Sequence, residues 1–329
     1  MMKGYRKTAK GFDHTLELPI LSKEGLFEAL VLRADYVFKA DFIGYNYAEK
    51  KALCRCLLDS LPRGLQEKLL AYTITIMGKN KLTCTEIAKS LHEQGLLREK
   101  SVAYTAELVW LWLTKGRHPL GKHIKHRWKI VRGDFEYIVG RMLGDGSGPI
   151  DETKKSKTLR LPSIDKDSIN YASKILSKMN LHNKVYYCTT TGLYVASFHN
   201  ILIYWLLMKL RNSPEFAEGF GSFLCLSEDL AWRFVQGISD SEGSCSLNKN
   251  QFGDPAVNIE ISNTKQHILE LCKKCLEANG IISHISKNGN LGITSKFHVV
   301  LAAKKKIFLL ERKKKKLEDL IELVYNERP

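Results

Sequence analysis

Two stretches with the same layout decide how this chain folds: "YIVGRMLGDGSG" (Tyr137–Gly148) and "FVQGISDSEGSCS" (Phe234–Ser246). In each stretch an aromatic residue and at least one apolar residue come first. Two small residues follow four positions apart, and an acid and a glycine complete the pattern. Glycine inside a helix costs about 0.5–1 kcal/mol relative to alanine, so small residues at matching positions need a structural reason.

The small residues of each stretch lie one helical turn apart and therefore share one face. They are Gly140 and Gly144 in the first stretch, and Gly237 and Ser241 in the second. Small residues at this spacing let two helix backbones approach more closely than leucines would. The sequence therefore predicts two helices that pack side by side through these four residues.

An acid ends each predicted helix, Asp145 in the first and Glu242 in the second. The helix dipole disfavours a carboxylate at a C-terminus by a few tenths to about 1 kcal/mol. Two carboxylates that meet at one axis also repel each other, so at least one pKa should rise. A divalent cation removes both penalties, and Mg²⁺ fits best because it takes oxygen ligands and leaves room for a phosphate. Gly146 and Gly243 are expected to adopt the left-handed cap conformation.

The chain repeats itself from about residue 133 onward, and the order of predicted elements is α-β-β-α-β-β-α in each copy. A hairpin turn at Asn288-Gly289 and a long basic helix complete the second copy. A duplicated unit with one acid per copy suggests a pseudo-two-fold protein with its active site on the symmetry axis. The predicted fold class is α+β, with the two halves at residues 129–225 and 226–329.

Residues 1–128 are predicted to form a mostly helical domain that ends in a basic linker. Thr83 or Thr85 can cap a short helix that Gly95 ends, and a second helix starts at about Ser101. This pair resembles a helix-turn-helix that could bind DNA, and a small helical bundle without such a role is an equal alternative.

Composition bounds the partners and the compartment. The chain has a formal net charge of +16 and a sequence pI of about 9.4, which favours a nucleic acid or an acidic membrane surface as partner. The longest apolar run, Ile201–Met208, is far too short to span a bilayer, and the N-terminus lacks a signal-peptide core. We expect reduced cysteines and an intracellular, cytoplasmic protein.

The two motifs resemble those of the double-motif, single-chain LAGLIDADG homing endonucleases, and the resemblance covers about residues 133–320. It implies that each half lays a curved antiparallel sheet into the major groove of DNA. It also implies that Asp145 and Glu242 bind Mg²⁺ or Mn²⁺ and that Asn263 organises water in the active site. The counterpart of Asn263 would be Ser163, and the basic residue that completes the pocket has Lys296 and Lys209 as candidates.

The resemblance makes a site-specific double-strand DNA endonuclease, acting as a monomer, the leading hypothesis. Basic side chains are expected to contact DNA from both halves: Lys154, Lys155, Lys157, Arg160, Lys249, Lys287 and Lys296.

Two alternatives stay open on the same fold: a non-cleaving DNA-binding regulator and an RNA-binding intron-splicing maturase. Arg141 stands at a motif position that is usually apolar, and Pro149 interrupts the first strand expected in the first half. Such departures are compatible with a copy that binds without cutting. Both acids are present, which favours an active site.

Overall fold

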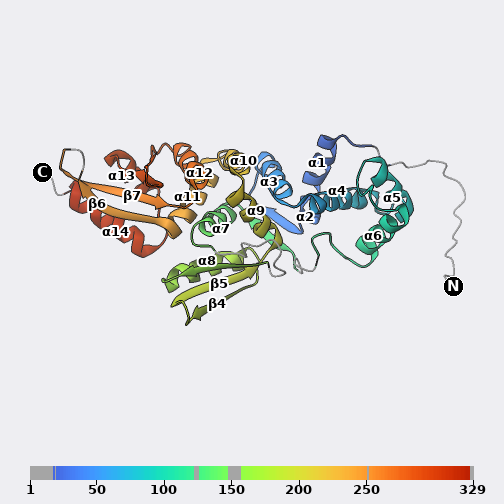
Figure 1. Cartoon of the computed structure of the whole chain (residues 1–329), viewed down its shortest axis with the longest axis horizontal. Coiled ribbons are helices and arrows are strands. Elements are labelled where there is room, and N and C mark those ends of the chain that lie inside the picture. Colours follow the sequence, from blue (N-terminus) through green and yellow to red (C-terminus); the bar gives the residue numbers. More distant parts are fainter. Residues whose placement is uncertain (1–17, 19, 122–125, 147–156, 250–251, 327–329) are drawn as a thin grey trace, which may run out of the picture. The chain divides into compact units, whose positions relative to one another are not determined.

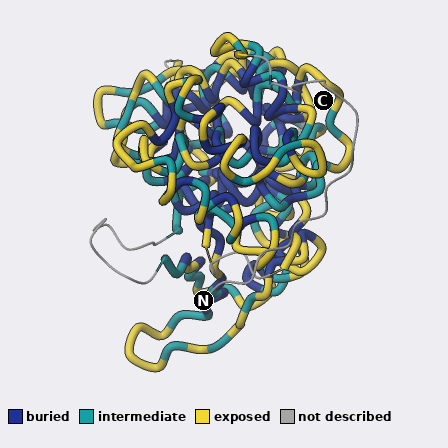
Figure 2. The backbone as a smooth tube through the Cα atoms, turned by 90° about the vertical axis from the view of Figure 1, so that its right-hand side faces the viewer, coloured by how far each residue is buried: buried dark blue, intermediate teal, exposed yellow. Residues whose placement is uncertain are grey.

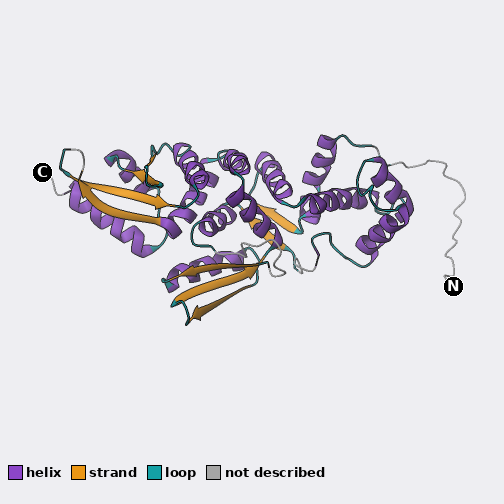
Figure 3. Ribbon diagram, in the orientation of Figure 1, coloured by secondary structure: helices purple, strands orange, loops and turns teal. Residues whose placement is uncertain are grey.

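The structure is a computed structural model in which the chain forms two compact units. It describes residues 18, 20–121, 126–146, 157–249 and 252–326. Unit 1 is drawn from residues 1–30 and 67–119, and unit 2 from residues 31–66 and 120–329. The fold mixes helices and strands, as predicted (Figure 1, Figure 3).

The described helices are α1 (Lys23–Leu32), α2 (Ala34–Val37), α3 (Tyr47–Ser60), α4 (Arg63–Gly78), α5 (Cys84–Glu93), α6 (Val102–Thr114), α7 (Asp134–Leu143), α8 (Lys166–Lys178), α9 (Ile201–Asn212), α10 (Pro214–Leu224), α11 (Glu228–Glu242), α12 (Gln266–Glu277), α13 (Lys296–Lys304), α14 (Glu311–Ile321) and the π-helix η2 (Glu322–Asn326). The described strands are β1 (Ala40–Ile43), β2 (Trp128–Val131), β3 (Thr158–Ser163), β4 (Asn183–Cys188), β5 (Leu193–His199), β6 (Gly243–Lys249), β7 (Pro255–Ser262), β8 (His284–Ile285) and β9 (Asn290–Ile293).

Unit 1 is a small helical bundle that contains the predicted helix pair. The hydroxyl of Thr83 caps α5 by accepting the Glu86 N–H at 3.3 Å, and Ser101 caps α6 by accepting the Tyr104 N–H at 3.2 Å. Both helices therefore start where the sequence predicts. Their apolar faces close a core of Leu26, Ala71, Ile74, Ile87, Leu91, Leu96, Leu97, Val109 and Trp112. This geometry fits a helix-turn-helix and a plain bundle alike, so a role in DNA binding stays a prediction.

The two motif-containing halves of unit 2 share one strand order. The first-half sheet runs β3-β5-β4 and the second-half sheet β6-β7-β9-β8, with antiparallel pairing throughout. Strands β3, β5 and β4 thus correspond to β7, β9 and β8. The first-half strand expected around Pro149, the counterpart of β6, falls outside the described residues. The predicted fold class, with two related halves, is confirmed.

Residues 31–66 belong to unit 2, which corrects the predicted domain boundary at 128. Strand β1 pairs in parallel with β2, with Ala40 opposite Trp128, and α3 packs on α9 and α10. Strand β2 begins at residue 128, where the sequence predicted the basic linker to end. The boundary proposed between the two halves stays a prediction, because both halves lie in one compact unit.

Arg132 ties residues 31–66 to the starts of both motif helices. Its guanidinium is bidentate on the buried Glu49 of α3, with Nη2 at 3.0 Å from Oε1 and Nε at 3.1 Å from Oε2. It also donates to the Ser227 hydroxyl at 2.7 Å and lies 3.4 Å from Asp229, at the start of α11. Because removing one partner of a buried pair leaves an uncompensated charge, this cluster holds the segment firmly to the core.

Glu136 is a second buried acid at the start of α7. Its carboxylate accepts hydrogen bonds from the Tyr45 hydroxyl and from the Gly133 N–H, both at 2.6 Å. Burial nevertheless raises the pKa of Glu136 to about 7. The folded protein therefore holds a proton here that the unfolded chain releases near its usual pKa of about 4.3.

This difference in pKa predicts a stability that depends on pH. The contribution of Glu136 to the free energy of unfolding should be fully present below pH ~4.3 and fall by about 3 kcal/mol as pH rises to ~7, because the folded state must then ionise a buried acid. Glu136→Gln should remove most of this slope, whereas Glu218→Gln, on an exposed part of α10, should keep it. Urea unfolding at several pH values measures both. An unchanged slope in Glu136→Gln would assign the dependence to another group.

The basic C-terminal region forms two helices, α13 and α14, where the sequence suggested one long helix. Lys306 takes a left-handed conformation, with φ of 57°, between them. Ile307 and Phe308 follow it and are fully buried. The gain from burying these two side chains explains why the chain breaks the helix at this point.

Buried positions lie in the interior of the fold and exposed ones on its outward turns (Figure 2). All eight cysteines are free thiols. Among the residues that the structure describes, no helix has the length and apolar character needed to cross a membrane.

Candidate active site

Helices α7 and α11 pack against each other through reciprocal glycine contacts. A Cβ atom on Gly140 would overlap the carbonyl oxygen of Phe234, and a Cβ on Gly237 would overlap that of Tyr137. When Asp145 is aligned with Glu242, Gly140 corresponds to Gly237 and Tyr137 to Phe234. The same contact is therefore made twice, as a two-fold axis between the helices requires.

The same pairing continues to the ends of the helices. A Cβ on Gly144 would overlap the side chain of Ser241 and lie 2.8 Å from Cγ of Glu242. Gly146 and Gly243 do not take the left-handed conformation predicted for them: neither has a positive φ. Both positions instead need glycine because there is no room for a Cβ. A Cβ on Gly243 would overlap the Ser239 carbonyl oxygen and lie 2.7 Å from the Phe308 ring, and a Cβ on Gly146 would overlap the Met142 carbonyl oxygen.

The two motif acids meet where the helices end. Glu242 is the last residue of α11, and Asp145 follows two residues after α7. Burial raises the pKa of both carboxyl groups, and the charge of Asp145 raises the pKa of Glu242 further. The rise in pKa that the sequence predicts for an acid pair is thus present. The two acids are close enough to sense each other's charge.

A cation caps each of these helix ends, and the two caps correspond. The ammonium of Lys313 donates to the carbonyl oxygens of Ser239 (3.1 Å) and Gly243 (2.7 Å), as well as to two carbonyls between them. The guanidinium of Arg211 donates to the carbonyl oxygens of Met142 and Gly146, which are the equivalent positions of the first half. Burial lowers the pKa of Lys313 to about 8. The nearby charge of Lys313 lowers the pKa of both motif acids.

Neither Lys296 nor Lys209 occupies this place, although the sequence named both as candidates. The Nζ atom of Lys296 lies 4.8 Å from the ring centroid of Tyr325. Lys209 is exposed, and its charge acts on Asp59 and Glu215. The basic residues beside the acids are Lys313 and Arg211, which sequence reasoning did not identify.

Replacing Lys313 by methionine should destabilise unit 2. We expect Lys313→Met to lower the free energy of unfolding by about 2–3 kcal/mol, because buried carbonyl oxygens lose their donor. Lys315→Met removes the same charge from an exposed position of α14 and should stay within about 0.5 kcal/mol of the parent. Chemical denaturation compares the two. Equal losses would mean that net charge, and not the cap, matters.

Several buried polar side chains lie close to the two acids. Arg141 is fully buried in α7 and donates to the Ser168 hydroxyl; within the described residues its Nε and Nη1 have no hydrogen-bond partner. Asp240 accepts a hydrogen bond from the Tyr137 hydroxyl at 2.8 Å and from the Leu309 N–H at 3.0 Å. The charge of Arg141 lowers the pKa of Asp145, opposing the effect of burial. The arginine at an apolar motif position therefore acts electrostatically on the site.

Asn263 lies at the end of the first motif helix, although it comes from the second half. Its Nδ2 donates to the Leu143 carbonyl at 3.2 Å, and its Oδ1 accepts the Lys265 N–H at 3.0 Å. Ser163, the counterpart named from the sequence, accepts the Asp165 N–H at 3.1 Å. Asn263 is thus bound to the backbone two residues before Asp145, and its role toward water stays a prediction.

The basic residues expected to contact DNA are placed differently from one another. Lys154 and Lys155 lie outside the described residues. The Nζ atom of Lys157 lies 4.4 Å from the ring centroid of Tyr204, and Lys287 is exposed in the turn before β9. Lys249 is exposed at the end of β6 and pairs with Pro255, two residues after the pair of Leu247 with the buried Val257. Side chains alternate along a strand, so Lys249 starts on the same face as Leu247, and its contact with DNA stays a prediction.

The donor set fits a hard divalent cation. The described residues contain no cluster of three or more His, Cys, Asp or Glu side chains that could hold a metal ion. Mg²⁺ needs fewer, because one or two carboxylates plus water and substrate phosphate complete its octahedron. Asp145 and Glu242 are two carboxylates of this kind, one at the end of each motif helix.

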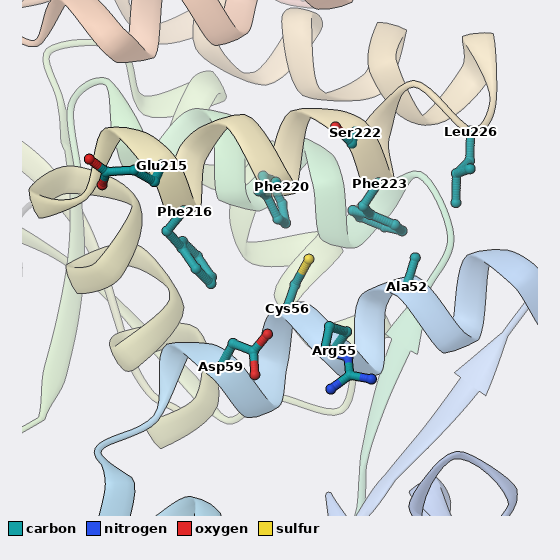
Figure 4. A pocket seen from close by; sticks show the side chains of 11 residues that line it. Ala52, Arg55, Cys56, Asp59, Glu215, Phe216, Phe220, Ser222, Phe223 and Leu226 are labelled. Carbon is teal, nitrogen blue, oxygen red and sulfur yellow. The ribbon is translucent and has the colours of Figure 1, made fainter. Parts of the chain in front are cut away.

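A separate cavity of about 400 Å³ lies between α3 and α10 (Figure 4). Phe216, Phe220 and Phe223 of α10 face Arg55 and Cys56 of α3 across it. Neither motif acid lines this cavity, so it is no part of the candidate active site.

Solved structures of LAGLIDADG proteins are similar to this chain. The N-terminal LAGLIDADG domain of DUF199/WhiA is 13% identical, with 56% of this chain and 86% of that chain covered and a TM-score of 0.38. Full-length DUF199/WhiA from Thermatoga maritima is 13% identical, with 58% and 60% covered and a TM-score of 0.39. The homing endonuclease I-DmoI in complex with DNA and Ca is 14% identical, with 57% and 98% covered and a TM-score of 0.38.

No protein-family model and no curated protein matches the chain. Assignment of residues and of activity rests on the contacts within this chain.

Proposed function

We propose that this protein is a divalent-metal-dependent, site-specific endonuclease for duplex DNA, with Asp145 and Glu242 as its metal-binding acids. The observation that carries the proposal is the reciprocal packing of α7 and α11, which brings one acid from each half to the same helix ends. Two like charges in a partly buried place favour a cation between them.

In this proposal each residue of the site has a separate role. Asp145 and Glu242 supply anionic oxygen ligands, one per half, so that each half serves one strand of the duplex. Lys313 and Arg211 fix the helix ends that carry the acids and add positive charge beside the phosphates. Asn263 holds the backbone next to Asp145. Bound Mg²⁺ or Mn²⁺ would polarise the scissile phosphodiester and favour ionisation of water.

The test is cleavage of a randomised duplex library by the purified protein in Mg²⁺, in Ca²⁺ and in excess chelator. We expect cutting at one long site in Mg²⁺ or Mn²⁺, binding without cutting in Ca²⁺, and no cutting with chelator. Cleavage that persists in chelator would contradict a metal-dependent site.

A second candidate is a DNA-binding regulator on the same fold. The capped helix pair of unit 1 favours it, because a nuclease needs no accessory helical unit to cut. In that case the same experiment gives selective binding in Mg²⁺ without cutting. Preference for structured RNA over duplex DNA in a competition arm would instead support an intron-splicing maturase.

A further inference from the structure

The first-half sheet has an open face that carries positive charge. Leu159, Leu161 and Phe198 are buried on one face of this sheet. Side chains alternate along strands, so the opposite face carries the neighbouring positions. Arg160, Ser197 and Lys184 stand in one row across β3, β5 and β4 on that opposite face, and Thr158 pairs with His199 in the next. Arg160, Lys184 and His199 are all exposed.

The corresponding face of the second-half sheet is polar but has no lysine or arginine among its described strand positions. Val257, Ile259 and Ile261 are buried on the covered face of β7. The open face presents Ser244, Ser246, Asn248, Asn258, Glu260, Ser262, Asn290 and His284.

The strand register orders this polar face into rows. Ser246 stands opposite Asn258. In the next row Glu260 stands opposite Gly292, and a Cβ on Gly292 would lie 3.0 Å from Cε1 of His284. Glycine at this position therefore lets the imidazole lie across the strand.

We propose that the two halves bind duplex DNA by different physics: the first-half sheet through charge, the second-half sheet through uncharged hydrogen bonds to base edges. This inference rests on the proposed function, together with the expectation from the resemblance that each half lays its sheet into the major groove. Lysine and arginine release counterions when they bind DNA, so their contribution to affinity depends on salt. This holds even for an arginine that contacts the edge of a guanine. Asparagine pairs with adenine, and serine with several base edges, without that salt dependence.

The open face of the second-half sheet is therefore the main reader of sequence. Its side chains are donors and acceptors at strand positions of regular spacing, as base-edge recognition requires. The row of Arg160 and Lys184 supplies affinity that depends little on the sequence of its half-site.

The experiment uses the full chain in Ca²⁺, with a duplex selected from the library and single-base-pair variants of it, between about 50 and 200 mM salt. Arg160→Gln with Lys184→Gln should lower the slope of log affinity against log salt by about 2 and weaken all duplexes alike. Ser246→Ala with Asn258→Ala should leave the slope unchanged and reduce discrimination about 10-fold at base pairs in one half-site. Lys315→Gln, an exposed charge on α14, is the control for net charge.

The outcomes separate this inference from the proposed function. The inference would be overturned if the two double variants changed the salt slope equally. It would also be overturned if only the Arg160 and Lys184 variant lost discrimination between duplexes. Either result would leave DNA binding itself established. If the parent protein selects no duplex, both this inference and the proposed function are wrong.

Discussion

Asp145→Asn and Glu242→Gln should each slow DNA cleavage by at least about 10³-fold while leaving DNA affinity nearly unchanged. Each substitution keeps the shape of the side chain and removes one anionic ligand. The first places an amide beside Glu242, and the second places one beside Asp145, so neither variant retains the pair. Single-turnover rates in Mg²⁺ measure cleavage, and equilibrium binding in Ca²⁺ measures affinity.

Stability distinguishes lost chemistry from lost folding in these variants. Burial raises the pKa of both acids, so ionising them costs more free energy in the folded protein than in the unfolded chain. Neither amide variant should therefore be less stable than the parent. Asp319→Asn removes a carboxylate from an exposed position of α14 and should cut at the parental rate. Cleavage within about 10-fold of the parent in either acid variant would exclude that acid from the site.

Gly237→Ala should lower the free energy of unfolding by about 3 kcal/mol or more, although alanine is the better helix former by about 1 kcal/mol. The added methyl group would overlap the Tyr137 carbonyl and lie 2.9 Å from the Arg141 nitrogen. Both are backbone atoms of the facing helix, so only separation of α7 from α11 can relieve the overlap. Gly140→Ala meets the equivalent atoms of α11 and should behave alike.

Gly219 provides the matched control for this prediction. It lies in α10, and a Cβ there would have no other atom within 4 Å. Gly219→Ala should therefore raise the free energy of unfolding by about 0.5–1 kcal/mol. Thermal or urea unfolding of the variants gives the sign directly. A stabilised Gly237→Ala would show that the helices do not approach as closely as their glycines allow.

The helix pair could be predicted from the sequence because its signal is local. Two small residues four positions apart, followed by an acid, indicate which face of the helix packs against another helix and where the helix ends. All of this information lies within about ten consecutive residues. The halves could be matched because the order of elements recurs along the chain. Each of these inferences needs only the order of residues, which the sequence carries in full.

The capping cations and residues 31–66 could not be predicted because they depend on long-range geometry. Lys313 is one lysine in the run 313–316, and which of them turns inward depends on the break before α14. The pairing of β1 with β2 joins distant segments whose apolar pattern indicates only that each is partly buried. The face of Lys249 depends on strand register, where one residue reverses the answer.

Arg141 has a consequence for how this architecture could arise. Its counterpart in the second half is Ile238, and the backbone nitrogens of both lie against the glycine of the opposite helix. A homodimer of first halves would bury two such guanidinium groups, and each buried charge without a partner costs several kcal/mol. Fusion of the two copies into one polypeptide removes that constraint. After the duplication, one copy could acquire a single buried charge, whereas a homodimer would have to bury that charge twice.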